Sequence, residues 1–277
     1  MLDPTTRWDG RHFWRTMRTI EGPATLHLTV TDSEVTADAV GPGAHLALER
    51  VDSMLGSNDR YPDLFTRHPV IARAQRNYGL LKLGASLDPY HELLPAVLGQ
   101  RVTAREAYMQ WREICTDFGQ PAPQSTGAPT LFLPPEPDAL RKLPYWKFHR
   151  YGIERHRAQT LTEVARHENF LHRLVTLPPQ DATNQLQKIA GVGPWTAAVA
   201  GLAAFGDSDA LCVGDFHAKN TVAFALTGAH RGTDEEMCRL LSVYSPHRAR
   251  VLRWLQLDGW NAPAHGPRRR NLNVALM

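Results

Sequence analysis

The sequence predicts a mainly α-helical protein with an N-terminal α+β part, in which a small antiparallel sheet domain precedes a helical core. Two observations predict this fold class. Apolar and polar residues alternate only before about residue 50, whereas apolar residues recur at helical spacing after residue 63. The chain has 277 residues, 43% of them hydrophobic, so it can bury a sizeable core. We expect a β-containing domain over 1–65 and the helical core over 66–277.

The N-terminal part carries the pattern of β-structure from residue 11 to about residue 50. Segments 24–30 and 34–40 alternate, and Thr-Asp-Ser at 31–33 is typical of a turn between antiparallel strands. Gly-Pro-Gly at 41–43 indicates a second turn. Segment 44–51 fits either a third strand or a short helix.

The rest of the chain has the spacing of helices. Thr103 and Glu106 form an S/T-x-x-E capping box at the start of one of them. A loop rich in Pro, Gly and Ser follows at 119–129. The spacing predicts helices at about 89–102, 103–119, 137–143, 154–166, 167–176, 181–189, 195–205, 216–226, 233–242 and 245–257.

Charge and cysteine content exclude several classes of protein. A formal net charge of +3 permits an anionic partner without demanding one. Lysines and arginines gather at 141–157, at Arg248, Arg250 and Arg253, and at 268–270, either as a solvated surface or as a binding surface. Three widely spaced cysteines are too few for a disulfide framework or a cysteine-rich metal site. With neither a secretion signal nor a bilayer-spanning segment, we expect a cytoplasmic monomer, nucleoid-associated if bacterial, that contacts no membrane.

The segment 184–206 combines two helical patterns with a very short connection, Gly191-Val192-Gly193-Pro194. Glycine permits positive φ and close approach of another backbone, and proline is favoured in the first turn of a helix. The backbone amides of such a turn face outward at a helix N-terminus, which suits an anion such as phosphate. A helix–turn–helix with a glycine stop and no ligand is the alternative.

Asp215 directly precedes an apolar helical segment. Taken alone, it is typical of a helix N-cap, whose carboxylate accepts amide hydrogen bonds from the next turn. A carboxylate in that setting also stays ionised, because amides and the helix dipole favour the anion. The residue therefore has a structural interpretation and a catalytic one.

These features together resemble a known family. The pattern Leu-x-x-Ile-x-Gly-Val-Gly-x-x-Thr-Ala at 186–197 resembles the helix-hairpin-helix motif of DNA repair proteins, and Val-x-Asp at 213–215 extends the likeness to the HhH-GPD superfamily of DNA glycosylases. The resemblance implies that Asp215 is catalytic. It also implies that amides of Gly191, Gly193 and Thr196 hold a DNA phosphate, and that a monovalent cation (Na⁺ or K⁺) binds the backbone carbonyls of Gln187, Ile189 and Val192.

The segment Gly-Val-Gly-Pro-Trp-Thr-Ala at 191–197 resembles the 3-methyladenine glycosylases of the AlkA type. Bifunctional members carry a lysine nucleophile where this chain has Trp195, so no Schiff base can form from this position. By resemblance Trp195 lines the base pocket, where an aromatic face attracts a cationic alkylated purine. Further base-pocket residues expected on this basis are Gln100, Phe216 and Trp254, and further DNA contacts are Arg101, as a wedge, and Lys219.

The sequence thus indicates a monofunctional DNA glycosylase of base excision repair that binds damaged double-stranded DNA, flips an N-alkylated purine out of the duplex and hydrolyses its glycosidic bond. No organic cofactor is expected. Two alternatives stay open: a glycosylase for deaminated or oxidised bases, and a non-catalytic DNA-binding protein with an intact hairpin. The enzymatic interpretation requires that the Asp215 carboxylate opens into a cleft beside Trp195.

Overall fold

A four-stranded antiparallel sheet with strand order β1-β2-β3-β4 forms the N-terminal part of the computed structural model, which describes residues 3–60, 68–124 and 127–262. The strands are β1 (Thr6–Trp8), β2 (His12–Thr19), β3 (Gly22–Val30) and β4 (Val35–Val40). The strands predicted at 24–30 and 34–40 are β3 and β4, paired from Val30 with Val35 to Thr25 with Val40. The short strand β1 was not predicted from the sequence.

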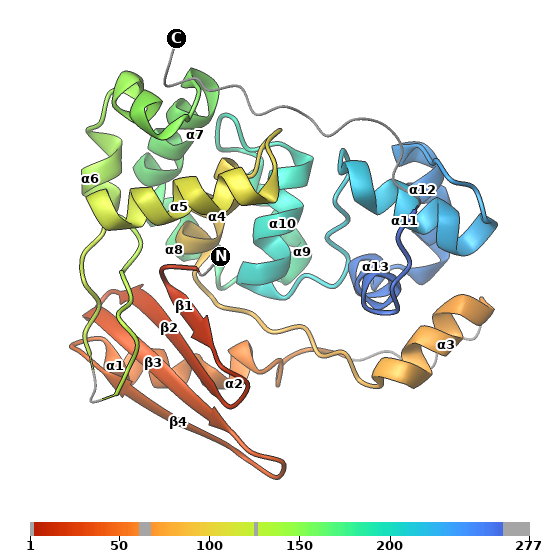
Figure 1. The fold of residues 1–277 in the computed structure, drawn as a ribbon, viewed down its shortest axis with the longest axis horizontal. Coiled ribbons are helices and arrows are strands. Elements are labelled where there is room, and N and C mark those ends of the chain that lie inside the picture. The colour runs from red at the N-terminus through yellow and green to blue at the C-terminus, as the bar shows by residue number, and fades with distance from the viewer. Residues whose placement is uncertain (1–2, 61–67, 125–126, 263–277) are drawn as a thin grey trace.

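Segment 44–51, for which two interpretations stayed open, is helical. Helices α1 (Ala44–Glu49) and α2 (Val51–Met54) cover one face of the sheet (Figure 1). Their side chains close a small apolar core over Met17, Leu26 and Leu28, which project from β2 and β3. The local pattern alone did not distinguish strand from helix in this segment. The helix is favoured because it covers the apolar face of the sheet, which must be buried.

The remainder of the described chain is helical, as predicted, but the helices at 69–78 and 145–151 were not among those predicted, and the helix predicted at 89–102 ends at Leu98. The helices are α3 (Pro69–Tyr78), α4 (Pro89–Leu98), α5 (Ala104–Phe118), α6 (Pro137–Arg141), a 3₁₀ helix η1 (Tyr145–Tyr151), α7 (Arg155–Arg166), α8 (Glu168–Leu174), α9 (Pro179–Leu186), α10 (Pro194–Phe205), α11 (Phe216–Thr227), α12 (Asp234–Leu241), a 3₁₀ turn η2 (Ser242–Tyr244) and α13 (Arg248–Leu257). No helix among the described residues is long and apolar enough to cross a membrane.

The helices enclose two apolar cores. The larger core is formed by α4 to α10, and the smaller by α3 together with α11, α12 and α13. Helix α3 directly follows the sheet region in sequence, yet it lies beside α13 at the other end of the chain (Figure 1). The boundary predicted between residues 65 and 66 lies outside the described residues.

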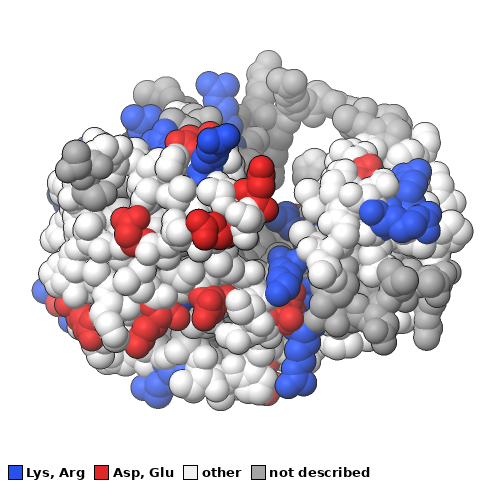
Figure 2. All heavy atoms as spheres, turned by 90° about the horizontal axis from the view of Figure 1, so that it is seen from below, with Lys and Arg blue, Asp and Glu red and all other residues white. Residues whose placement is uncertain are grey.

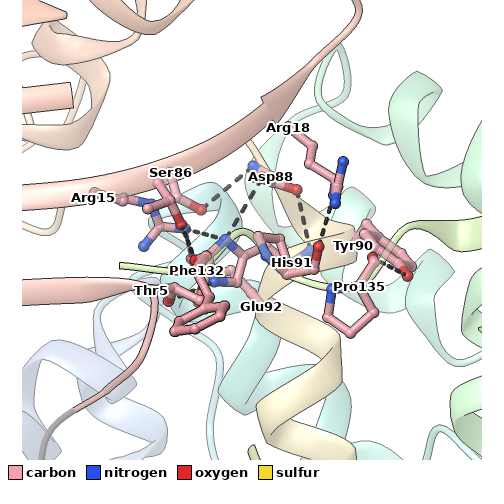
Figure 3. Close-up of polar contacts among 12 residues, drawn as sticks. Thr5, Arg15, Arg18, Ser86, Asp88, Tyr90, His91, Glu92, Phe132 and Pro135 are labelled. Carbon is pink, nitrogen blue, oxygen red and sulfur yellow. Dashed lines mark hydrogen bonds and ion pairs between the residues drawn. The ribbon is translucent and has the colours of Figure 1, made fainter. Parts of the chain in front are cut away.

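Buried polar contacts join the sheet to the first turn of α4 (Figure 3). Arg15 of β2 pairs with Glu92 at 2.6 Å, and the ring of His91 contacts the hydroxyl of Thr5 at 3.1 Å. Asp88 caps α4 by accepting the backbone N–H of His91. Both side chains of the Arg15–Glu92 pair are largely buried, at 11% and 15% exposure. The network therefore fixes the N-terminal end of α4 against the sheet.

Candidate active site

A cleft of about 1150 Å³ opens where the two helical cores meet. One side is lined by the end of α4 and its loop (99–102), by 154–156 and by the hairpin (187–196), all of which belong to the larger core. The other side is lined by 213–217, the loop into α11 of the smaller core. The structure thus brings the predicted hairpin and the predicted catalytic aspartate into one cleft.

The hairpin is built as the sequence predicts, with Pro194 as the first residue of α10 and Val192 buried in the larger core. Gly191 has a φ of 87°, and a Cβ there would lie 2.0 Å from the hydroxyl of Thr160. Gly193 has an ordinary φ of −88°, and no atom of the described residues lies within 4 Å of its Cβ position. The fold itself requires glycine at the first position, but nothing within the described protein requires it at the second.

The N-terminus of α10 faces the cleft without a side-chain cap, because the N-cap residue is Gly193. The first amides of a helix have no partner within the helix, so this end can bind an anion. Gln187, Ile189 and Val192, whose carbonyls were predicted to hold a monovalent cation, also line the cleft. The Ile189 carbonyl already accepts the Val192 amide at 3.0 Å. The phosphate and cation roles of the hairpin stay predictions.

Gln100 lines the cleft, but its side chain is engaged by the hairpin. Its amide nitrogen donates to the carbonyl of Gly191 at 3.0 Å and to the hydroxyl of Thr196 at 2.9 Å. Thr196 is itself only 2% exposed, so its side chain is an internal partner. These contacts tie the end of α4 to the hairpin, a positioning role that the sequence did not indicate.

Arg101 is exposed at the rim of the cleft and has a φ of 58°, a left-handed conformation that is uncommon for a residue with a side chain. The turn that carries it is braced from inside. Arg157 is 2% exposed and donates to the carbonyl of Leu98 and to the side-chain oxygen of Gln110, both at 2.8 Å. A strained residue held by a buried scaffold is typical of a functional position.

Asp215 is both the N-cap of α11 and a lining residue of the cleft. Its Oδ1 accepts the backbone amides of His217 at 2.7 Å and Ala218 at 2.8 Å. Its Oδ2 accepts the indole N–H of Trp195 at 2.9 Å. The structural and catalytic interpretations are therefore compatible, since one oxygen caps the helix while the other faces Trp195 in the cleft.

The loop that bears Asp215 is held from α12. Asp234 accepts the backbone amide of Gly214 at 2.9 Å through one oxygen and pairs with the ammonium of Lys219 at 3.0 Å through the other. Burial alone would raise the pKa of Asp234, but the Gly214 amide and Lys219 outweigh it, so this pKa lies below its ordinary value. Lys219, predicted to contact DNA, is thus paired with Asp234 and does not line the cleft.

The structure separates two of the predicted aromatic pocket residues. Phe216 lies at the cleft, 59% exposed, with the guanidinium of Arg231 5.4 Å from its ring centre. Trp254 is fully buried in the smaller core and is not part of the cleft, so its prediction as a base-binding residue is wrong for this structure. The physical reason is the phase of α13, which turns Trp254 and Leu255 together into the apolar core.

Several arginines of the described basic segments are paired with carboxylates. Within 141–157, Arg141 pairs with Asp138 at 2.5 Å and Arg150 with Asp117 at 2.9 Å. Arg250 is fully buried against Asp59, and Arg248 pairs with Asp209 at 2.7 Å. The arginines at 268–270 lie outside the described residues. On the face in Figure 2, acidic and basic side chains are interspersed and no broad patch of one sign is seen.

Burial raises the pKa of the Cys212 thiol, near the Asp215 loop, to about 12, so this thiol is protonated at neutral pH. The described residues contain no group of three or more His, Cys, Asp or Glu side chains placed to hold a metal ion.

Solved structures show which fold this is. No family model and no curated protein sequence matches the chain. Its structure nevertheless has the fold of the HhH-GPD-type DNA glycosylases. It is similar to the 3-methyladenine DNA glycosylase of Archaeoglobus fulgidus, with a TM-score of 0.72 and 15% identity over 90% of this chain and 87% of that one.

Two further solved structures share this fold. The 8-oxoguanine glycosylase/lyase of Clostridium acetobutylicum, solved with double-stranded DNA, gives a TM-score of 0.63 at 14% identity over 92% of this chain and 97% of that one. The 3-methyladenine DNA glycosylase of Schizosaccharomyces pombe, solved with abasic DNA, gives 0.56 at 16% identity over 69% and 92%. The fold predicted from the hairpin and from Asp215 is thereby confirmed.

Proposed function

We propose that this protein is a monofunctional DNA glycosylase that flips an N-alkylated purine from duplex DNA and hydrolyses its glycosidic bond. The observation that carries the proposal is the contact between Asp215 and Trp195 at 2.9 Å inside a cleft shared with the hairpin. The fold, which is that of DNA glycosylases at low sequence identity, supports it.

The carboxylate of Asp215 supplies the charge that this reaction needs. As the bond between base and deoxyribose breaks, positive charge develops on the sugar, and a nearby carboxylate stabilises it. Two backbone amides and one indole N–H donate hydrogen bonds to this carboxylate, and none of these donors carries a positive charge. Water then completes the hydrolysis and leaves an abasic site. A non-catalytic DNA-binding protein could use Asp215 as a helix cap, but it would not need a negative charge facing the cleft beside DNA phosphates.

Trp195 determines the type of reaction. An indole has no amine to attack the sugar, so the site offers no Schiff base at the position where lyases of this fold carry lysine. Its ring lines the cleft and is half-buried, which leaves an aromatic surface for stacking with a cationic base. Phe216 is the second aromatic side chain at the cleft.

The hairpin would bind the DNA backbone. Gly193 is open on the side where a side chain would project, so a phosphate can approach the uncapped amides of α10 closely. The rim residue Arg101, which lines the cleft, would enter the gap left by the flipped base. A monovalent cation on the carbonyls of Gln187, Ile189 and Val192 would add charge at the same phosphate.

A glycosylase for oxidised or deaminated bases is the second candidate. It is favoured by the burial of Trp254, which leaves the cleft fewer aromatic surfaces than the sequence predicted. Hydrogen bonds from polar groups at the cleft would then select a neutral base.

The test is base release from methylated duplex DNA by the wild-type protein and by Asp215→Asn. We expect wild type alone to release 3-methyladenine or 7-methylguanine. Parallel duplexes with 8-oxoguanine, uracil or hypoxanthine distinguish the second candidate. Equal release by wild type and by the Asn variant contradicts the catalytic assignment, and binding without release on every duplex supports the non-catalytic alternative.

A further inference from the structure

The indole of Trp195 touches both walls of the cleft. Its pyrrole nitrogen donates to Oδ2 of Asp215 at 2.9 Å, on the wall formed by the smaller core. At the far end of the ring, Cη2 lies 3.2 Å from the point where a Cβ on Gly99 would stand, at the end of α4 in the larger core. One side chain thus spans the distance between α4 and the carboxylate.

We propose that Trp195 is a positioning residue for Asp215, and that Gly99 sets how far the indole reaches across the cleft. This inference rests on the proposed function and deepens it. The role is distinct from stacking on a base, because it depends on the indole N–H and not on the ring face.

The hydrogen bonds of Asp215 explain why the indole matters. Oδ1 is held by two amides of its own helix, which leaves Oδ2 as the oxygen available to the sugar. The indole N–H is a donor only, so it fixes Oδ2 by one lone pair and leaves the other open to the cleft. Without this donor, the carboxylate can rotate while Oδ1 still caps the helix, and Oδ2 is no longer held at one position in the cleft.

Gly99 is explained by the same contact. Its φ of −74° and ψ of −8° are ordinary helical values, so the backbone does not require glycine there. The nearest atoms to a Cβ at this position are Cη2 of Trp195 at 3.2 Å and the carbonyl oxygens of Ala96 and Pro95 at 3.4 and 3.5 Å. An added methyl group would therefore press on the indole, which would have to shift and so disturb its hydrogen bond to Asp215.

The decisive variant replaces Trp195 by benzothienylalanine, which keeps the bicyclic shape and lacks the N–H donor. We expect the single-turnover rate of base release to fall about 10-fold or more, as for loss of a hydrogen bond to a charged group. Affinity for abasic-site duplex DNA should change less than about 3-fold, because phosphate contacts are kept. Gly99→Ala should give the same pattern with a smaller loss of rate.

A merely structural or stacking role predicts otherwise. If the benzothienylalanine protein keeps the wild-type rate, the positioning role is overturned while the proposed function stands. Trp195→Phe serves as the companion variant, since it removes the donor and part of the ring. A wild-type rate there would overturn the inference as well.

The contact is also measured without any activity. In ¹⁵N-tryptophan-labelled protein, the Trp195 indole N–H signal, identified by its loss in Trp195→Phe, should move and exchange faster in Asp215→Ala. Gly99→Ala should move the same signal. An unchanged signal in both variants overturns the inference, whether or not the wild-type protein releases a base. If the signal shifts in the variants but the wild-type protein releases no base, the result counts against the proposed function alone.

Discussion

The two ends of α4 are both crowded with polar groups, but the chain uses them in opposite ways. At the N-terminal end, Arg15, Glu92 and His91 are buried and contact one another or the sheet (Figure 3). At the C-terminal end, Gln100 is hydrogen-bonded to the hairpin, and Arg101 is exposed at the rim of an open cleft. Polar groups that face each other inside a protein fix its parts together, whereas polar groups that face a cleft are available to a ligand.

The difference predicts which property each change will affect. A change at the buried end should lower stability and leave the chemistry of the folded protein unaltered. A change at the cleft that the open end faces should lower activity or DNA affinity and, unless it meets packed atoms, leave stability nearly unaltered. Variants at the buried end and at the cleft therefore test the comparison.

The largest effect is expected at the buried pair. Glu92→Ala leaves the guanidinium of Arg15 buried without its carboxylate, which should cost about 3–5 kcal/mol of unfolding free energy. Denaturant unfolding measures this loss, and the single-turnover rate of the folded protein should match that of wild type. Replacing both residues by methionine is the control and should cost less. A normal stability for Glu92→Ala would show that this end does not fix the sheet.

The next effect concerns the cleft that the open end of α4 faces. Asp215→Asn should lower base release by about 100- to 1000-fold, because the charge that stabilises the sugar is lost. Stability should change by about 1–2 kcal/mol, since asparagine caps a helix as well as aspartate does, but its amide nitrogen cannot accept the indole N–H of Trp195. Rates and denaturation midpoints are measured on the same preparation. A stability loss as large as that of Glu92→Ala would mean that the capping role dominates.

The hairpin glycines offer a matched pair within the open region. Gly191→Ala meets Thr160 and a φ of 87°, so it should destabilise the fold by about 1–3 kcal/mol. Gly193→Ala meets no described atom and should cost less than about 1 kcal/mol, yet weaken duplex DNA binding about 3- to 10-fold. Titrations at several salt concentrations measure the binding. Unchanged affinity in Gly193→Ala would remove the hairpin from the DNA interface.

The smallest effect is a pH dependence at the buried end. Burial lowers the pKa of His91 below its ordinary value of 6.5, and Arg15 lowers it further. The unfolded chain takes up this proton near pH 6.5 while the folded chain resists it, so stability should fall as the pH drops below 6.5, by at most about 1.4 kcal/mol per pH unit.

The comparison variant is His91→Gln, which should show a shallower loss of stability in the same range. Glu92 has a pKa below its ordinary 4.5, because Arg15 and His91 outweigh its burial, so its contribution is lost only at lower pH. Burial also lowers the pKa of His247, which is the same in both proteins, so the difference between the two denaturant unfolding curves from pH 7 to 5 reports His91. Parallel curves for wild type and variant would contradict its assignment.

Local sequence determined the helices and their ends. Thr103 caps α5, Pro194 opens α10 and Asp215 caps α11, each as predicted, because capping and helical preference depend on residues only a few positions apart. The hairpin turn was predicted correctly for the same reason, because its glycines and Pro194 are adjacent in the sequence. The sequence alone was thus sufficient for the fold that the solved structures confirm and for most of the helices, but it did not predict α3 or η1, and the roles of Asp215 and Trp195 stay predictions.

Only the tertiary structure decided where side chains went. It buried Trp254, turned Gln100 toward the hairpin, and placed Arg250 against Asp59, a residue 191 positions away. It also set the indole of Trp195 between Gly99 and Asp215. These outcomes depend on the packing of distant helices against one another, and the period of a single helix carries no information about which neighbour its side chains will meet.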